Sequence, residues 1–201
     1  MIDIAIHFKE RKVERIGDYK GTFLNHLEAH YRPGERELAR ELASAIGLTV
    51  VEMQFTANSK PMLASHFNGD DRDPTNNVMF LYEMSPMLAR VVEVLDDLVV
   101  ADADLREAIS TYRNAVAQMP PLSAHFGIRF RSEAELEAAL ERLAKGVSAQ
   151  LKDRIAVWEV PPYEPIEGLP SVRQVFVRSN VISVGTMGFE QAIELQALPG
   201  S

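Results

Sequence analysis

The sequence predicts an α+β fold of two tandem βαβββ modules joined by a helical connector. First, two stretches alternate polar and apolar residues, which is typical of a half-buried strand. Second, each stretch is followed by one helical pattern and three strand-like runs. Third, a helical segment lies between these two units. We therefore expect a leader at 1–20, a first module at 21–84, the connector at 85–121 and a second module at 122–201.

The first module is marked out by turn residues and by spacing. An alternating strand at 22–31 ends at Pro33 and Gly34, a pair that breaks strands. Apolar residues then recur every four positions over 35–47, which predicts a helix that stops at Gly47. The runs that follow are rich in β-branched and aromatic residues, as strands are. We expect the remaining strands of this module at 48–55, 61–68 and 78–84.

The connector reads as two helices. Ser85 followed by proline is a typical helix start, and it predicts a helix over 85–100. A second helical pattern runs over 103–119. It must end at Pro120, because proline cannot continue a helix and also restricts the residue before it. The segment 85–121 therefore separates the two strand-containing units.

The second module repeats the order of the first. Ser132 and Glu135 form a capping-box pattern at the start of a helix over 132–146, and Gly146 supplies its stop. A proline-rich stretch at 161–170 interrupts the strand-like runs. We expect the strands of this module at 122–130, 154–160, 171–179 and 189–196.

Composition excludes several classes of function. The chain has 201 residues, a formal net charge of −8 and scattered lysines and arginines, which argues against binding nucleic acid. No apolar run approaches the roughly 20 residues that span a membrane, and from the charged N-terminal stretch we expect no signal peptide. With no cysteine, a metal must be held by histidine and carboxylate. We expect a cytoplasmic protein that binds a small organic molecule.

Two histidines and two glutamates occupy matching places in the predicted modules. His26 and His125 lie on the opening strands, and Glu83 and Glu194 lie on the closing strands, with separations of 83 − 26 = 57 and 194 − 125 = 69 residues. Imidazole and carboxylate are ligands of borderline divalent metals. Two half-sites that face each other would complete a cage of four ligands. If the strand slips by one residue, Tyr82 replaces Glu83 as the inward side chain.

Two further side chains are expected in the cavity. His30 and Arg129 each follow a ligand histidine by four residues, so each shares its strand face. We expect both to bind substrate. Arg129 suits a substrate carboxylate, because a guanidinium binds that group through two hydrogen bonds.

The repeated order, with histidine opening and glutamate closing each module, resembles the vicinal oxygen chelate superfamily, over roughly residues 20–197. The resemblance implies an open barrel-like sheet around a cavity. It also implies Fe, Mn, Co, Ni or Zn bound by the four residues, and a substrate chelated through two oxygens. Glu194 and Glu83 would then be catalytic, moving a proton in isomerase, epimerase or lyase chemistry. A homodimer also fits, because some members complete the site between two chains.

The resemblance leaves two alternatives open. His26, His125 and Glu194 alone match the triad of extradiol dioxygenases, which use Fe(II). Those enzymes carry a tyrosine about ten residues before the last glutamate, and the stretch VGTMGFEQAIE here has none. The other alternative is a protein of the same fold that binds a small molecule without catalysis.

Overall fold

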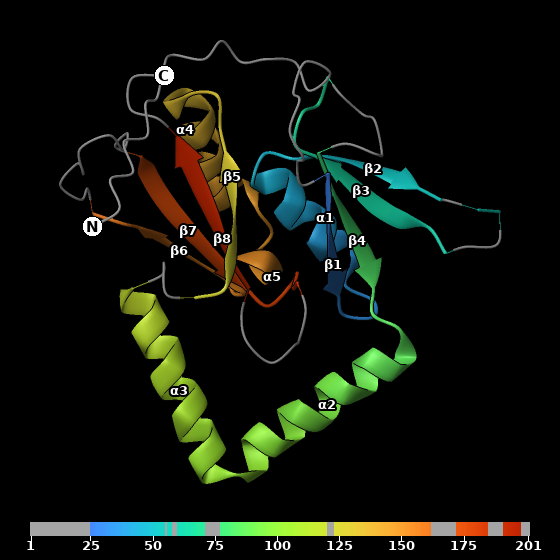
Figure 1. Ribbon diagram of the computed structural model, residues 1–201, viewed down its shortest axis with the longest axis vertical. Coiled ribbons are helices and arrows are strands. Elements are labelled where there is room, and N and C mark those ends of the chain that lie inside the picture. Colours follow the sequence, from blue (N-terminus) through green and yellow to red (C-terminus); the bar gives the residue numbers. More distant parts are fainter. Residues whose placement is uncertain are drawn as a thin grey trace, which may run out of the picture.

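The computed structural model is an α+β protein with helices and two four-stranded mixed sheets (Figure 1). It describes residues 25–54, 56–57, 60–70, 77–119, 123–161, 172–184 and 191–197. The expected leader at 1–20 and most of the proline-rich stretch at 161–170 lie outside the described residues. None of the helices in these ranges combines the length and apolar character needed to cross a membrane.

The first sheet is built from the first half of the chain. Its strand order is β1-β4-β3-β2, with β1 parallel to β4 and the other neighbours antiparallel. The parallel pair requires a long connection, which includes α1. The elements are β1 (His26–Tyr31), α1 (Arg36–Ala45), β2 (Thr49–Met53), β3 (Met62–His66) and β4 (Val78–Glu83).

The second sheet repeats this arrangement in the second half. Its order is β5-β8-β7-β6, again with the first and last strands parallel and the others antiparallel. Its elements are β5 (His125–Arg129), α4 (Glu133–Glu141), a π-helical turn (Arg142–Gly146), α5 (Ala149–Lys152), β6 (Ile155–Glu159), β7 (Arg173–Ser179) and β8 (Gln191–Ala197). The helix expected over 132–146 therefore changes its hydrogen-bond pattern after Glu141.

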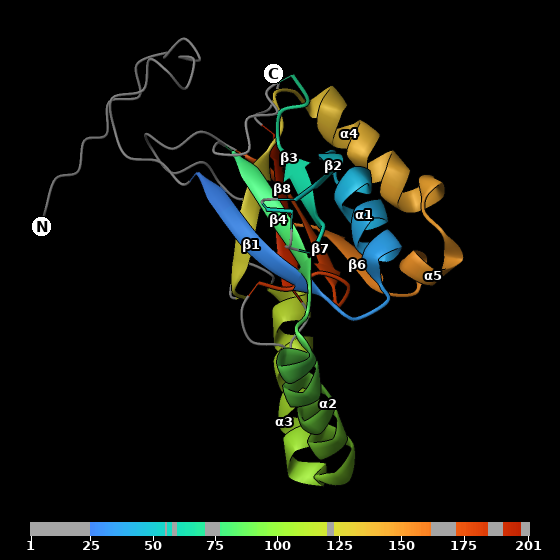
Figure 2. The same ribbon diagram turned by 90° about the vertical axis from the view of Figure 1, so that its right-hand side faces the viewer.

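Two helices connect the sheets, as the sequence predicts. These are α2 (Pro86–Ala101) and α3 (Ala103–Gln118). Side-chain caps fix both starts: Ser85 Oγ accepts from the Leu88 amide at 3.2 Å, and Asp102 Oδ1 accepts from the Leu105 amide at 2.9 Å. The two helices project away from the sheets (Figure 2).

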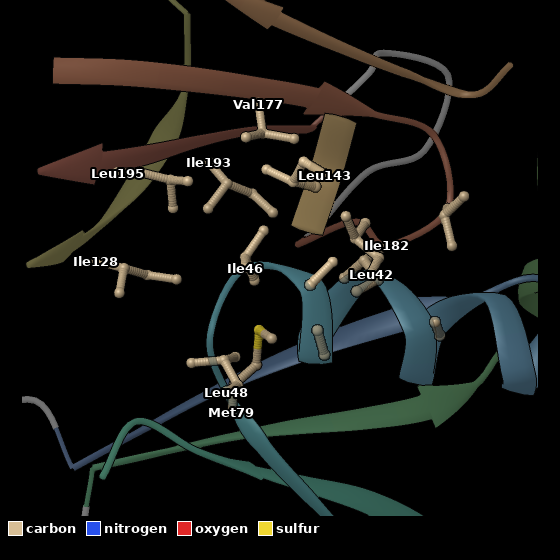
Figure 3. Packing of buried hydrophobic residues seen from close by; sticks show 14 of the residues in the cluster. Leu42, Ile46, Leu48, Met79, Ile128, Leu143, Val177, Ile182, Ile193 and Leu195 are labelled. Atoms are coloured by element: carbon tan, nitrogen blue, oxygen red, sulfur yellow. The ribbon is translucent and has the colours of Figure 1, made fainter. Parts of the chain in front are cut away.

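One hydrophobic core joins the two halves. Buried residues of α1, of both sheets and of the π-helical turn belong to a single cluster. Figure 3 shows Leu42 of α1, and Ile46 directly after this helix, between strands of the two sheets, with Met79 on one side and Ile193 on the other. The described residues form no closed barrel. The open barrel around a cavity stays a prediction.

Candidate functional site

His125 and Glu194 lie on the same face of the second sheet. In the parallel ladder His125 is opposite Ala192 and Gly127 is opposite Glu194. Residues two apart on a strand share a face, so His125 and Glu194 are diagonal neighbours. On the other side of β8, Phe176 is opposite Glu194. Its ring meets the imidazole of His125 edge-on, with centroids 5.2 Å apart.

The two side chains meet through a ring nitrogen of His125 and a carboxylate oxygen of Glu194. His125 Nε2 lies 3.4 Å from Glu194 Oε2, and the glutamate side chain is only 7% exposed. His125 Nδ1 lies 2.7 Å from the carbonyl oxygen of Ser123, which can only accept. Nδ1 therefore carries a hydrogen, and Nε2, which faces the carboxylate, has a lone pair in a neutral ring and an N–H in a protonated one. A cation between the two atoms, either a proton or a metal ion, makes this contact favourable.

The second carboxylate oxygen of Glu194 is held by amides. Oε1 accepts from Gln196 Nε2 at 2.6 Å and also from Gln174 Nε2. These bonds fix the carboxylate and direct Oε2 toward His125. A Cβ atom at Gly127 would lie 3.4 Å from Oε2, so glycine at this position leaves that oxygen uncrowded. Gln196 follows Glu194 by two residues, so strand alternation could have revealed it; nothing in the sequence pointed to Gln174.

The first sheet has no matching carboxylate beside its histidine. On the parallel ladder Glu28 is opposite Phe80, so Phe80 holds the place that Glu194 holds in the second sheet. The Phe80 ring lies 5.8 Å from the exposed imidazole of His26. His26 Nδ1 contacts Asn25 Oδ1 at 2.7 Å.

The structure corrects the expected placement of Glu83. Glu83 is opposite Tyr31, which is 1% exposed and belongs to the main core, so its side chain leaves the sheet on the face opposite His26. Its Oε2 accepts from the Gly34 amide at 3.4 Å, and Oε1 lies 3.9 Å from Lys60 Nζ. The strand is displaced by one residue from the expected register, and Tyr82 takes the other face.

Tyr82 lies beside His30 on that face, with ring centroids 6.5 Å apart. Burial raises the pKa of the Tyr82 phenol above its usual value, and the negative charge of Glu28 adds to the effect. The backbone of His30 is bonded to the second half of the chain. Its amide donates to Ser183 O at 2.8 Å, and the Ser183 amide donates back to His30 O at 2.9 Å. His30 thus ties the edge of the first sheet to the segment after β7.

Among the described residues, no three histidine, aspartate or glutamate side chains are grouped closely enough to hold a metal ion. The structure brings His125 and Glu194 together, but it does not bring His26 or Glu83 to them. The four-ligand cage is therefore not formed in this structure. His125 and Glu194 are the pair that could ligate a metal.

A cavity of about 640 Å³ lies next to strand β5; Phe126 and Gly127 line it, whereas His125 and Glu194 themselves do not. Gly127 and Arg129 of β5 line it, as does His26 of β1, so it reaches one edge strand of each sheet. Its volume is typical of small-molecule sites. Arg129 donates to Gln196 Oε1 at 3.2 Å and so joins the hydrogen bonds that hold Glu194.

The cavity lining is positively charged in an acidic protein. Arg129, Arg131 and Arg142 line it, against one carboxylate, that of Glu135. Glu135 forms an ion pair with Arg131 at 2.9 Å. Arg142 donates to the carbonyl oxygen of Ala45 at 3.1 Å, and that contact carries no opposite charge. After the Arg131–Glu135 ion pair is counted, the guanidinium charges of Arg129 and Arg142 are left without a carboxylate in the lining, and this excess positive charge favours an anionic ligand.

Comparisons with known proteins identify no family. No family model matches the chain, and no curated protein matches it. One solved structure, described as that of the hypothetical protein SA1046 from S. aureus, is similar at 8% identity with a TM-score of 0.39. The match covers 87% of this chain and 99% of the other.

Proposed function

We propose that His125 and Glu194 bind a divalent metal ion, and that the protein uses it to act on a small oxygenated anion. The class we propose is a vicinal oxygen chelate enzyme with isomerase, epimerase or lyase chemistry. The observation that carries this proposal is the 3.4 Å contact between His125 Nε2 and Glu194 Oε2, with the glutamate side chain 7% exposed and the histidine side chain 26% exposed. Such a contact calls for a positive charge between the atoms.

The pair fits a metal of the Zn or Fe type. Two ligands with bonds of about 2.1 Å at a tetrahedral angle lie roughly 3.4 Å apart. The bond from His125 Nδ1 to a backbone carbonyl is the usual outer contact of a ligating histidine. Catalytic metal sites commonly have three protein ligands. His26 lines the same cavity as Gly127 and is the candidate for the third.

The element order supports the proposed fold family. Both sheets place the first and last strands of their half in parallel, with the same strand order. We therefore infer that the halves are tandem βαβββ modules. The shared core between them and the cavity at their edges are the features that an open arrangement of two such sheets requires.

The proposed chemistry assigns a role to each polar group. A bound metal supplies a Lewis acid that stabilises negative charge on a substrate oxygen. Arg129 binds a carboxylate of the substrate through its guanidinium. Glu194 would have to leave the metal for its Oε2 to accept a proton from a carbon next to the substrate carbonyl and return it at another position. The amides of Gln174 and Gln196 hold Glu194 Oε1, so the proton carrier keeps its orientation.

A second candidate is a protein that binds an organic anion without metal or catalysis. The observation that favours it is the excess of arginine in the cavity lining. In that case the cation between His125 and Glu194 is a proton.

Oxygen uptake with a catechol would indicate the dioxygenase alternative instead.

Titration with Co²⁺, Mn²⁺, Ni²⁺ and Zn²⁺ tests the metal proposal. Calorimetry should show one equivalent bound, and the metal should raise the unfolding temperature of the parent. A metal at 100 times its dissociation constant stabilises the fold by about 2.7 kcal/mol. Glu194→Gln should weaken binding at least tenfold. Glu83→Gln is the matched control, because the same change lies on the opposite sheet face and should leave affinity unaltered.

Two results would contradict the proposal. One is equal metal affinity in the parent and in Glu194→Gln. The other is a loss of affinity in Glu83→Gln of the same size as in Glu194→Gln. Without metal, Glu194→Gln should unfold at or above the parent temperature, because the new amide can donate to Nε2 of a neutral His125 and replace the contact between the ring nitrogen and the carboxylate.

A further inference from the structure

Helix α2 carries an exposed apolar stripe. Met87, Val91, Val94 and Leu98 are separated by four, three and four residues, which places them on one side of the helix. Their exposed fractions are 80%, 53%, 40% and 48%. This spacing is the heptad pattern of a coiled-coil seam. Exposing four such side chains to water is unfavourable, so the stripe needs a partner.

The stripe is distinct from the side that anchors α2 to the body. Val92 is 1% exposed and packs with Met84 and Leu88, and Asp96 forms an ion pair with Arg32 at 3.0 Å. Leu88, Val92 and Asp96 follow one another at four-residue spacing, so they share a side of α2 that differs from the side of the stripe. Figures 1 and 2 show α2 projecting from the sheets, which leaves its outer side accessible.

We propose that two copies of this chain pair through antiparallel α2 helices. In the twofold arrangement Val91 packs against the partner's Val94, and Met87 packs against the partner's Leu98. Each contact then occurs twice, as an isologous interface requires. The stripe exposes on the order of 400 Å² in each copy, so two copies with their flanking polar residues approach the roughly 1,000 Å² of a specific interface.

Charge complementarity selects the antiparallel direction. Arg90 and Asp97 both flank the stripe on one side, and both are exposed, with Arg90 also paired to Glu93 of its own helix at 3.1 Å. In the antiparallel register Arg90 faces the partner's Asp97, which gives two opposite-charge pairs. In a parallel pair Arg90 would face the partner's Leu95, and Asp97 would face the partner's Asp102. The parallel pair therefore gains no ion pair and brings like charges together.

Light scattering with size exclusion tests the proposal on the full chain. The parent should elute with about twice the 22.5 kDa mass of one chain at tens of micromolar. Val91→Glu should raise the dimer dissociation constant at least 100-fold, because it places a charge in the seam. Val100→Glu is the matched control: Val100 is 74% exposed and lies on the other side of α2, so the dimer should persist.

Charge exchange tests the direction. Arg90→Asp and Asp97→Arg should each weaken the dimer about tenfold, and the double variant should recover it. Both residues are exposed, so circular dichroism should show an unchanged fold. A monomeric parent at 0.5 mM would overturn the proposal. Persistence of the dimer in Val91→Glu would overturn it too, and so would a double variant as weak as the singles.

Discussion

Leu42→Ala should destabilise both halves of the protein together. Leu42 is fully buried on α1, an element of the first half. It belongs to the same cluster as Ile182 and Ile193 of the second half (Figure 3). Removing its three outer carbons leaves a cavity that two sheets and a helix cannot easily fill. Substitutions of this kind cost about 2–5 kcal/mol.

Urea unfolding followed at two signals measures the effect. Trp158 is the single tryptophan and lies on β6 of the second sheet, so its fluorescence reports that half. Circular dichroism reports the helices of both halves. With a slope of about 2 kcal/mol per molar urea, the midpoint should fall by about 1–2.5 M in both signals. Leu105→Ala, at a residue 37% exposed on α3, should shift the midpoint by no more than a few tenths molar.

The result that refutes a shared core is a split between the signals. If Leu42→Ala lowers the dichroism midpoint but leaves the Trp158 transition where it is in the parent, the halves unfold independently. Coincident transitions in the parent and the variant support a single cooperative unit.

Gly47→Ala should cost more stability than Gly34→Ala, measured by the same unfolding assay. Both glycines have a positive φ, +96° at Gly47 and +80° at Gly34, and this backbone conformation costs an alanine about 1–2 kcal/mol. A Cβ at Gly47 would in addition lie 2.9 Å from Phe130 Cε1, whereas a Cβ at Gly34 would meet nothing within 4 Å. Equal costs would contradict the predicted clash. A hydrogen bond from Arg173 lowers the pKa of Glu159 below its ordinary 4.5, so this carboxylate adds stability above that pH and loses it as the pH falls. Arg173→Met should therefore unfold more readily than the parent at pH 7, and the gap should narrow in acid; a gap independent of pH would refute this.

The helices and strands could be predicted from the sequence because hydrophobic periodicity and capping residues, which act over a few neighbouring residues, determine them. Period-two alternation predicted the strands to within a few residues at each end, and β-branched runs added the remaining ones. Capping residues predicted the helix starts. Ser132 Oγ accepts from the Glu135 amide at 3.3 Å, and Glu135 Oε2 accepts from the Arg131 amide at 3.1 Å. These interactions join residues at most four apart, so they form without help from the rest of the fold.

The placement of site residues depended on strand register, which the sequence did not determine. Matching Glu83 with Glu194 assumed that the closing strands end alike. The ladders instead align Phe80 with Glu194, which leaves the first sheet without a carboxylate beside His26. A shift of one residue reverses every side chain on a strand, and both registers bury apolar residues of this sequence.

Long-range packing decided the rest. The sequence by itself determined the order of the elements, their boundaries and the residue types available to hold a metal. Only the tertiary structure decided that α1 fills the space between two sheets, that Gln174 and Gln196 orient Glu194, and that arginines gather at one cavity. The physical reason is that these contacts join residues far apart in the chain. Their energies depend on the three-dimensional fit of buried surfaces, and no short sequence pattern encodes that fit.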